Sequence, residues 1–263
     1  MSSDDSLNLN LIKSMIKAET EVFIFDELES TNQWLIERLS GGANHPLLCA
    51  AESQNSGRGR SGRVWQSPAY CNIYMSFCRQ INHQQKNITA ISLVMGLAII
   101  RVLKNHGIAE AKLKWPNDIL LAGKKLAGVL IEAKKIDGVL YLVVGIGVNV
   151  QMPEGFEIDS DLSWSDLSAH GLLPKDRSRM IAMIYNECQL MTELFIDKGF
   201  AFFQEEWCSV DEYAGQEVVV MDQDKLVVAG VAAGVDETGC LLVETDTGQT
   251  KLVSGDLSLR KRR

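Results

Sequence analysis

A short basic loop holds the densest group of chemically useful side chains in this chain. The stretch SQNSGRGRSGRVWQS, residues 53–67, places Arg58, Arg60 and Arg63 among three glycines. Guanidinium groups bind carboxylate and phosphate oxygens, and glycines allow backbone amides to approach a ligand closely. Because the whole chain has a formal net charge of -8, this positive charge is a local feature. We interpret the loop as a lid that closes on a small anion.

Two other interpretations of the loop stay open at this point. A flexible basic segment can bind RNA, and a glycine-rich stretch can simply be a solvated hairpin. RNA binding is disfavoured because the loop lacks the interleaved aromatic residues and the broad basic face that support a long polyanion. The acidic net charge also argues against a general nucleic-acid surface.

A second candidate cluster is KWPNDILLAGKKLAG, residues 114–128. Proline favours an extended backbone at the residue before it, and Lys114 and Asp118 flank this Trp-Pro pair. Asp118 could ligate a Mg²⁺ ion carried by a nucleotide, with Lys114 near the phosphates. Asn117 and Asp118 could equally form a plain turn. These residues alone do not separate the two interpretations.

Glycines mark two places where something approaches a strand closely. Gly128 follows Lys125, which lies in a turn, and a glycine inside a strand indicates close contact with a ligand or another segment. In GIGVNV, residues 145–150, Gly147 and Asn149 stand where a strand ends. This hexapeptide lacks the third glycine and the following helix of a dinucleotide fingerprint, and the chain has no P-loop motif.

Hydrophobic periodicity and turn residues predict the elements that must position these side chains. We predict helices at 7–18, 30–39, 88–104 and 175–197, and strands at 21–28, 47–53, 72–78, 111–115, 126–135 and 139–150. Ser30 and Gln33 have the spacing of a helix capping box. Turns at Ala122-Gly123 and Asp137-Gly138 indicate an antiparallel meander. From Tyr213 onward, short β runs with glycine turns predict a small barrel.

Composition limits the class of protein. With 263 residues, 46% of them hydrophobic, the chain can bury a sizeable core and suits one large domain plus a small one. The longest apolar run, 90–100, is about half the length of a bilayer span. The acidic start MSSDDSLNLN does not resemble an export signal, so we expect a cytoplasmic protein without a membrane span. The six cysteines form no CxxC pair, and we expect buried thiols.

In combination, the stretches STNQ, ESQNSGRGRSGRVW, KWPNDI, KLAGVLIE and GIGVNV, followed by a small β region that ends in SGDLSLR, resemble biotin protein ligases. The resemblance implies an α+β catalytic domain over residues 21–210, with a mixed, mostly antiparallel sheet and helices in the class II synthetase-like fold of biotin and lipoate ligases. It implies an SH3-like β-barrel over residues 211–263, and an N-terminal extension, residues 1–20, precedes both. The implied reaction activates biotin with Mg-ATP to biotinoyl-5'-AMP. Biotin then passes to a lysine of the biotin carboxyl carrier protein of acetyl-CoA carboxylase, with other biotin-dependent carboxylases as further candidates.

The resemblance also implies roles for single residues. It implies catalytic roles for Lys125, Arg58 and Arg60. The implied biotin-binding residues are Ser30, Thr31, Asn32, Gln54, Arg58, Arg60, Lys125 and Gly128. The implied nucleotide-binding residues are Arg60, Arg63, Trp65, Lys114, Asn117, Asp118, Lys125, Gly147, Asn149, Trp164 and Arg260, with Asp118 as the contact to Mg²⁺. Plain structural roles stay open for three of these positions: a helix cap at Ser30, a core tryptophan at Trp164 and a solvated tail at Arg260.

Other activities also stay open. A lipoate ligase or octanoyl transferase has the same fold, but those relatives lack a GRGRSGR-type lid combined with KWPND and a C-terminal barrel. A biotin sensor without catalytic activity is a further alternative. About 20 residues precede the first predicted strand, too few for a winged helix-turn-helix, so we expect no DNA binding and no repressor activity. Both a monomer and a homodimer fit the sequence.

Overall fold

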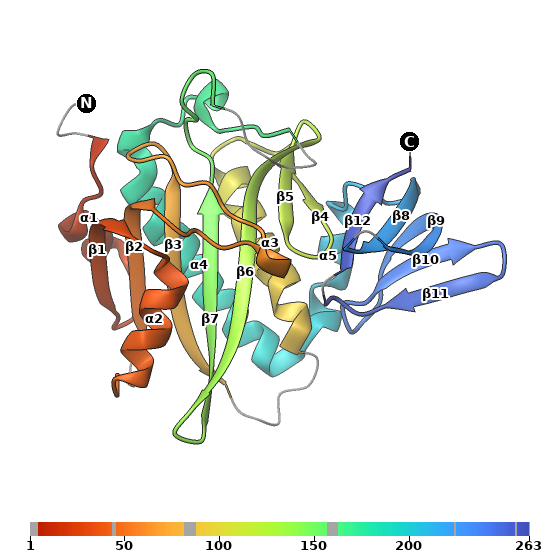
Figure 1. Ribbon diagram of the computed structural model, residues 1–263, viewed down its shortest axis with the longest axis horizontal. Coiled ribbons are helices and arrows are strands. Elements are labelled where there is room, and N and C mark those ends of the chain that lie inside the picture. Colours follow the sequence, from red (N-terminus) through yellow and green to blue (C-terminus); the bar gives the residue numbers. More distant parts are fainter. Residues whose placement is uncertain are drawn as a thin grey trace. The chain divides into compact units, whose positions relative to one another are not determined.

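The computed structural model describes residues 5–43, 46–81, 88–156, 163–223, 225–255 and 257–262. Its helices (Figure 1) are α1 (Leu9–Met15), α2 (Thr31–Ser40), α3 (Ile91–Asn105), α4 (Arg177–Lys198) and α5 (Gln204–Ser209). Its strands are β1 (Glu21–Leu28), β2 (Leu47–Gln54), β3 (Ile73–Ile81), β4 (Lys112–Lys114), β5 (Asp118–Leu121), β6 (Lys124–Ile136), β7 (Val139–Val148), β8 (Glu217–Asp222), β9 (Lys225–Val235), β10 (Leu241–Thr245), β11 (Gly248–Leu252) and β12 (Leu257–Lys261). Short 3₁₀ helices lie at Arg60–Gly62, Ile88–Ala90, Ser168–His170, Pro174–Asp176 and Phe200–Phe202. The α+β class is confirmed, and residues 1–4 of the predicted extension lie outside the described residues.

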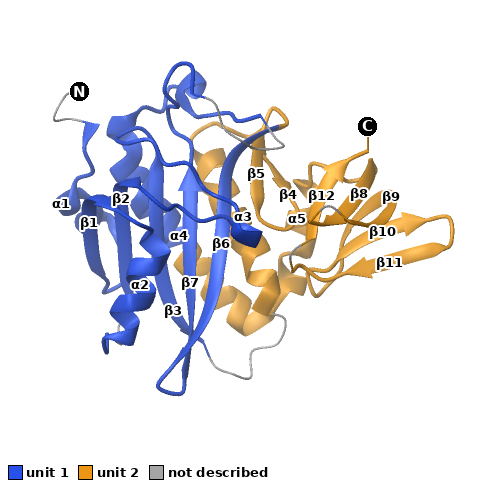
Figure 2. Cartoon of the chain, viewed as in Figure 1, with its two compact units in different colours: residues 1–84, 124–187 blue, residues 85–123, 188–263 orange. Residues whose placement is uncertain are grey.

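The chain divides into two compact units (Figure 2). Unit 1 comprises Met1–Gln84 and Lys124–Glu187, and unit 2 comprises Gln85–Gly123 and Cys188–Arg263. Unit 2 therefore combines the C-terminal strands with α3 and the β4–β5 hairpin. The boundaries predicted from sequence motifs, 21–210 and 211–263, divide the chain by another criterion, and they stay a prediction.

Five strands of unit 1 form a mixed sheet in the order β1-β2-β3-β7-β6. Only β1 and β2 pair in parallel, through the crossover helix α2, whereas β2 with β3, β3 with β7, and β7 with β6 are antiparallel. This order confirms the predicted mixed, mostly antiparallel sheet. The Asp137-Gly138 turn joins β6 to β7 and has positive φ at both residues, 48° and 84°, as a tight hairpin of this hand requires.

Helices cover both faces of the unit 1 sheet. On one face, Leu35 and Leu39 of α2 are buried against Cys49, Cys78 and Val143 of the sheet. On the other face, Phe77 of β3 meets Tyr185 of α4 edge to face, with ring centroids 5.5 Å apart. Because Phe77 and Cys78 are neighbours in a strand, they point to opposite faces. The α2 face is the one that carries the candidate site.

The start of α2 differs from the prediction. Within the described chain, the Ser30 side chain makes no capping hydrogen bond, and the Gln33 amide instead donates to Glu37 within the helix, at 2.7 Å. The predicted capping box is therefore wrong. Gln54, at the end of β2, takes over the cap because its Oε1 accepts the Thr31 N–H at 2.9 Å. A side chain from another element thus satisfies a backbone donor that the helix leaves open.

In unit 2, the segment Ile88–Asn105 is apolar enough to cross a membrane by length and composition, with a mean hydropathy of 1.6, but it is 67% buried within the fold. Small residues let this segment pack closely. A side chain at Gly96 would lie 3.0 Å from Leu113, and one at Gly239 would lie 2.6 Å from Ala90. Burial of this kind is typical of the core helix of a globular unit.

The C-terminal strands of unit 2 form an antiparallel sheet in the order β11-β10-β9-β8-β12. This arrangement confirms the predicted small all-β region. Strand β5 was not predicted, because its four buried residues form an apolar run too short to separate strand from turn by periodicity. Five of the cysteines are buried and Cys208 is half-buried, which agrees with the expectation of buried thiols.

Candidate functional site

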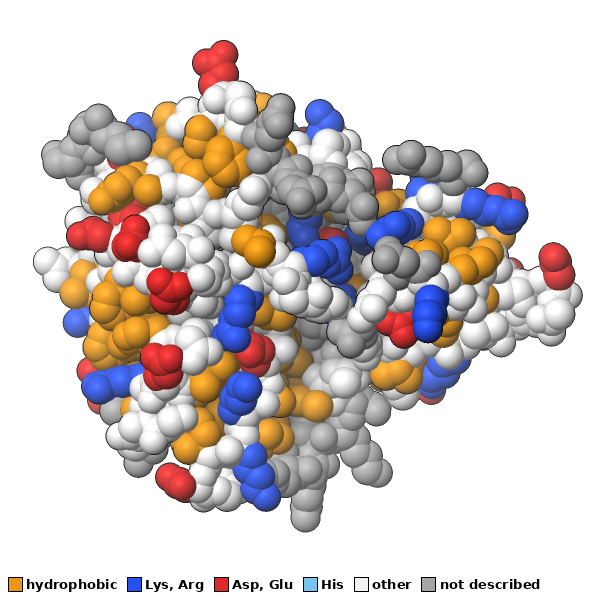
Figure 3. All heavy atoms as spheres, in the orientation of Figure 1, with side chains coloured by type: hydrophobic (Ala, Val, Ile, Leu, Met, Phe, Trp, Pro, Cys, Tyr) orange, Lys and Arg blue, Asp and Glu red, His pale blue; other side chains and the backbone are white. Residues whose placement is uncertain are grey.

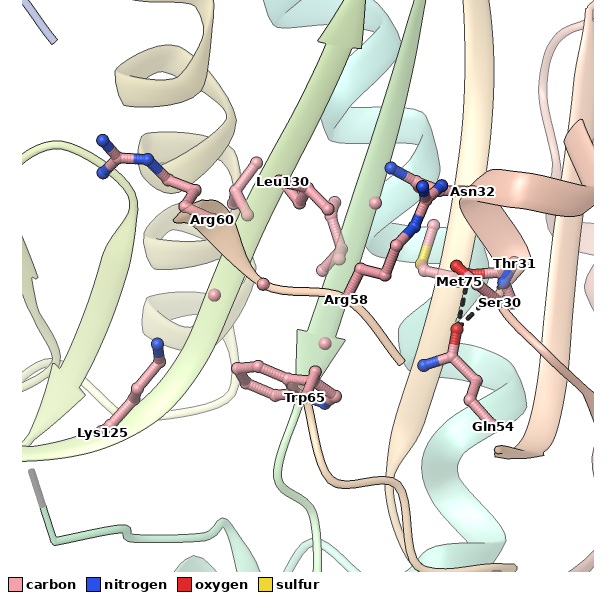
Figure 4. Close-up of a pocket in the computed structure, with 16 residues that line it drawn as sticks. Ser30, Thr31, Asn32, Gln54, Arg58, Arg60, Trp65, Met75, Lys125 and Leu130 are labelled. Atoms are coloured by element: carbon pink, nitrogen blue, oxygen red, sulfur yellow. Dashed lines mark hydrogen bonds between the residues drawn. The ribbon is translucent and has the colours of Figure 1, made fainter. Parts of the chain in front are cut away.

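A pocket of about 460 Å³, a volume that includes open solvent, lies in unit 1 (Figure 4). Its lining brings together three of the motifs found in the sequence: the start of α2, the arginine loop, and the paired strands β6 and β7. The predicted site residues that line it are Ser30, Thr31, Asn32, Gln54, Arg58, Arg60, Trp65, Lys125, Gly128 and Gly147.

One end of the pocket is a chain of hydrogen bonds between uncharged side chains. The Thr31 hydroxyl lies 2.7 Å from the Ser76 hydroxyl, and Ser76 donates to Asn32 Oδ1 at 2.6 Å. Gln54 accepts from the Thr31 N–H and donates to Ser67 at 3.0 Å. Ser30, Thr31 and Asn32 are at most 5% exposed. This end is therefore a pre-ordered set of amide and hydroxyl groups, suited to a neutral polar ligand group.

The arginine loop is a small hairpin. Trp65 N–H donates to the Gly57 carbonyl at 2.8 Å, and Gly59 N–H donates to the Arg63 carbonyl at 2.7 Å. The tip turns through Ser61 and Gly62, both with positive φ. The prediction that this loop joins two strands is confirmed, because it connects β2 to β3.

Glycines of β6 and β7 form the floor beneath the loop. Gly128 and Gly147 are paired across the two strands. A Cβ at Gly147 would lie 2.5 Å from the Trp65 ring, and one at Gly128 would lie 3.0 Å from it. The prediction of close approach at Gly128 is confirmed, and the approaching group is Trp65. The same ring covers Gly147, where the predicted approach of a ligand stays a prediction. The indole Nε1 is buried and has no hydrogen-bond partner among the described residues.

Gly145 of β7 allows a similar close approach, in this case by the Asn32 side chain at the start of α2. A Cβ at Gly145 would lie 2.4 Å from Asn32 Oδ1, so a larger residue would have to displace the Asn32 side chain. Gly145 and Gly147 are two residues apart and point to one face. The sequence contained this signal as GIG, although Gly145 was not among the predicted site residues.

Lys125 lies beside Trp65, with its Nζ 5.2 Å from the ring centroid (Figure 4), a geometry that favours a cation–π contact. Its backbone pairs with a segment far along the chain. Lys125 N–H donates to the Ser163 carbonyl at 2.8 Å, and Ser165 N–H donates to the Lys125 carbonyl at 2.9 Å. This pairing brings Trp164 next to Lys125 as a parallel bridge partner.

The Asn149 side chain forms hydrogen bonds to the backbone at Lys125. Its Nδ2 donates to the Lys125 carbonyl at 3.3 Å and to the Ser165 carbonyl at 3.1 Å. The side chain is 4% exposed. Asn149 therefore positions the backbone around Lys125, a role that the sequence prediction of a nucleotide contact did not include.

The remaining predicted residues lie outside the lining of the pocket. Arg63 is an exposed loop residue whose Nε donates weakly to the Arg60 carbonyl, at 3.4 Å. Lys114, Asn117, Asp118 and Arg260 belong to unit 2. There Lys114 and Asp118 are both buried, and their charged groups lie 3.4 Å apart. Arg260 is half-buried in β12 and pairs with Val219, so the solvated-tail interpretation is wrong.

Two residues that the sequence analysis missed form hydrogen bonds to side chains of the polar end, although they are not part of the pocket lining. Ser76 is fully buried between Thr31 and Asn32. Glu132 of β6 accepts from Asn32 Nδ2 at 2.9 Å and from Arg58 Nη2 at 3.0 Å. KLAGVLIE contained this glutamate, but an acid near a strand end has no distinguishing pattern in the sequence. On the visible face of unit 1, acidic and basic side chains are interspersed (Figure 3), which does not suit a long polyanion.

Comparison with known proteins finds two family models that match this chain. Residues 24–149 match the Biotin/lipoate A/B protein ligase family, and residues 213–260 match the Biotin protein ligase C terminal domain. The bifunctional ligase/repressor BirA of Escherichia coli K12 is 33% identical over 240 residues, which cover 91% of this chain and 74% of that protein. The biotin--[acetyl-CoA-carboxylase] ligase of Mycobacterium tuberculosis is 32% identical over 235 residues, covering 87% of this chain and 85% of that protein.

A solved structure is also similar over most of the chain. The biotin protein ligase from Aquifex aeolicus in complex with biotin and ATP superposes with a TM-score of 0.79 at 28% sequence identity. The match covers 92% of this chain and 99% of that one.

Proposed function

This chain belongs to the biotin protein ligase family, and we propose that it is a biotin--[acetyl-CoA-carboxylase] ligase that forms AMP. The observation that carries the proposal is the pocket of unit 1, in which a neutral polar end, two loop arginines and Lys125 line one cavity. A ligand with a polar uncharged ring and a carboxylate suits that arrangement. Biotin has both, as a ureido ring and a valerate carboxylate.

The first step brings two anions together. A carboxylate oxygen of biotin attacks the α-phosphorus of ATP, the new O–P bond forms, and the bond from the α-phosphorus to the bridging oxygen breaks to release pyrophosphate. At 4 Å and an effective dielectric of 20, two unit charges repel by about 4 kcal/mol. Cations in a pocket that excludes water can offset repulsion of this size.

We assign the main electrostatic role to Lys125. Its ammonium group lines the pocket together with Arg60, and it would stabilise the negative charge at phosphorus without forming a covalent intermediate. Asn149 supports it by holding the Lys125 carbonyl. Ser30, Thr31, Asn32 and Gln54 would bind the ureido ring, because amide and hydroxyl groups match its carbonyl and N–H groups.

We assign the nucleotide to the side of the pocket formed by Trp65 and Gly147, with Arg63 and Trp164 nearby in the same unit. The nucleotide contacts predicted for Lys114, Asn117 and Arg260, which belong to unit 2, stay predictions. Among the described residues, no group of three or more His, Cys, Asp or Glu side chains is placed to hold a metal ion. We propose that Mg²⁺ enters bound to ATP, and the contact predicted for Asp118 stays a prediction.

In the second step, the ε-amine of a carrier lysine attacks the acyl carbon of biotinoyl-AMP. An amide bond forms, the bond from the acyl carbon to the phosphate oxygen breaks, AMP leaves, and the amine loses a proton. Because water would hydrolyse the mixed anhydride, the arginine loop would also serve as a cover until the carrier arrives. We propose a biotin carboxyl carrier protein in the cytoplasm as the acceptor.

The test is biotin-dependent exchange of labelled pyrophosphate into ATP, with Mg²⁺ and without an acceptor. We expect exchange with biotin and none with lipoate or octanoate. Exchange with lipoate or octanoate alone would contradict the proposal and assign the chain to the lipoate branch. Biotin binding without exchange with any acid would contradict it in favour of a sensor.

A further inference from the structure

Glu132 lies where the arginine loop and helix α2 meet, and neither the sequence motifs nor the reaction assigns it a role. A single carboxylate oxygen, Oε2, accepts from Asn32 Nδ2 at 2.9 Å and from Arg58 Nη2 at 3.0 Å. We propose that Glu132 is a positioning residue that fixes the loop to the start of α2 before substrate binds. The proposal deepens the proposed function and rests on it for its kinetic part only.

The register of the sheet places Glu132 in this position. Gly128, Leu130 and Glu132 alternate along β6 and therefore point to one face. Their partners on β7 are Gly147, Gly145 and Val143. The loop tryptophan covers the first pair, Asn32 covers Gly145, and Glu132 is the next side chain on this face. A carboxylate at position 132 reaches Asn32 of α2 and Arg58 of the loop. A carboxylate at position 131 or 133 would point to the opposite face of the sheet.

Three of the contacts between the loop and the rest of unit 1 matter here, and the contact of Arg58 with Glu132 joins two charged groups. Trp65 packs on the glycine pair, and Ser67 accepts from Gln54. Arg58, by contrast, extends toward Asn32 (Figure 4) and pairs with Glu132. The ion pair of Arg58 therefore holds the first strand of the hairpin, whereas Trp65 holds the second.

The ion pair of Arg58 and Glu132 also lowers the net positive charge beside the pocket. Glu132 neutralises Arg58 in the ligand-free protein, so Arg58 is already oriented when a carboxylate ligand arrives. Pre-ordering lowers the entropic cost of binding. The side chains of Arg58 and Glu132 are 38% and 20% exposed, respectively, so water screens the pair. We therefore expect an effect of about three- to fivefold rather than loss of activity.

The first measurement does not require activity. Trypsin cuts after arginine, and the ligand-free protein would be digested briefly while cleavage after Arg60 and Arg63 is followed by mass spectrometry. Glu132→Gln retains an oxygen for Asn32 but removes the charge that holds Arg58. We expect about a three- to fivefold faster cleavage of the loop than in the unchanged protein. Glu27→Gln, which removes an exposed carboxylate from β1, is the matched control and should cleave at the original rate.

The second measurement separates an effect through Arg58 from a general loss of stability. Arg58→Gln breaks the same pair from the loop side and should speed cleavage to the same degree. In the Arg58→Gln background, adding Glu132→Gln should cause no further increase. Cleavage of Glu132→Gln at the original rate would overturn the proposal, and so would equal increments in both backgrounds.

In pyrophosphate exchange, Glu132→Gln should raise the KM for biotin by about three- to fivefold and change kcat by less than about twofold. A fall in kcat at constant KM would overturn the positioning role. If the unchanged protein exchanges no pyrophosphate with any acid, the proposed function fails. The digestion still decides whether Glu132 holds the loop.

Discussion

Two arginine–glutamate pairs of unit 1 have the same chemistry and opposite surroundings. Arg177 and Glu52 approach to 2.6 Å and are at most 2% exposed, whereas Arg58 and Glu132 approach to 3.0 Å and are 38% and 20% exposed. Arg177 also donates to the carbonyls of Pro174, Asn72 and Asp5. Glu52 accepts from the Leu7 N–H at 2.6 Å.

The difference shows how burial determines what an ion pair can do. The buried pair must satisfy nearly all of its donors and acceptors, because an unmatched charge in the interior is costly. It joins the N-terminal segment, β2 and the start of α4. In the exposed pair, one oxygen of Glu132 accepts from both Arg58 and Asn32, and the charged groups are open to water. A carboxylate ligand that enters the pocket can therefore compete with Glu132 for Arg58. We infer that the first pair maintains the fold and that the second serves the site.

The largest expected effect follows from removing Lys125, the residue to which we assign the main electrostatic role in the reaction. Lys125→Ala should lower the rate of pyrophosphate exchange by about a thousandfold, because it removes a cation beside the reacting phosphate. The midpoint of thermal unfolding should change little, since Lys125 is half-buried at the start of β6. Exchange at more than a tenth of the original rate would contradict the role of Lys125.

The buried pair should dominate stability. Arg177→Met should lower the free energy of unfolding by about 3 kcal/mol, because it leaves Glu52 charged and without a cation in the interior. Denaturation in urea measures this value. Adding Glu52→Gln should recover part of the loss. For the exposed pair, Glu132→Gln should change stability by less than about 1 kcal/mol, and equal losses in both pairs would remove the contrast.

Asp211 of unit 2 differs from Glu52, because its carboxyl group is removed from water without a strong cationic partner. Burial raises its pKa to about 6, with the Glu212 charge adding to the effect, and its Oδ2 has no hydrogen-bond partner among the described residues. Because the folded-state pKa lies above the unfolded value, the folded state binds the proton more tightly. Stability should therefore fall as the pH rises from about 4 to about 6.

Asp211→Asn should remove this dependence. Relative to the unchanged protein, the variant should gain about 2 kcal/mol of stability between pH 4 and pH 7. Urea denaturation of both proteins at several pH values measures the difference, in which other titrating groups cancel. A constant difference across this range would contradict the raised pKa.

The last prediction concerns the retention of biotinoyl-AMP by the arginine loop. Arg60→Ala should speed the escape of biotinoyl-AMP into solution by about tenfold, because the loop then loses one charge-assisted contact to phosphate. Chromatography of the filtrate after mixing with biotin and ATP measures the release. Arg38→Ala, which removes an exposed arginine from α2, is the control. Equal release from both variants would show that the loop does not retain the adenylate.

Much of this protein could be predicted locally. The strands at 21–28 and 139–148, the helix at 91–105 and the Asp137-Gly138 turn follow from periodicity and turn residues, because these signals depend on neighbours in the chain. The strand glycine at 128 correctly indicated close approach. The failed capping box at Ser30 shows the limit of such rules, since a side chain from β2 supplies the cap.

By itself, the sequence determined the motifs, the order of the elements and the local excess of positive charge in one loop, because all three are properties of neighbouring residues. Only the tertiary structure decided which glutamate pairs with Arg58 and which pairs with Arg177, and therefore which ion pair lies in the interior. That choice depends on burial and on partners about 74 and 125 positions away in the chain, which come together only when the sheet register is set. Ser76 and Glu132 belong to the site for the same reason.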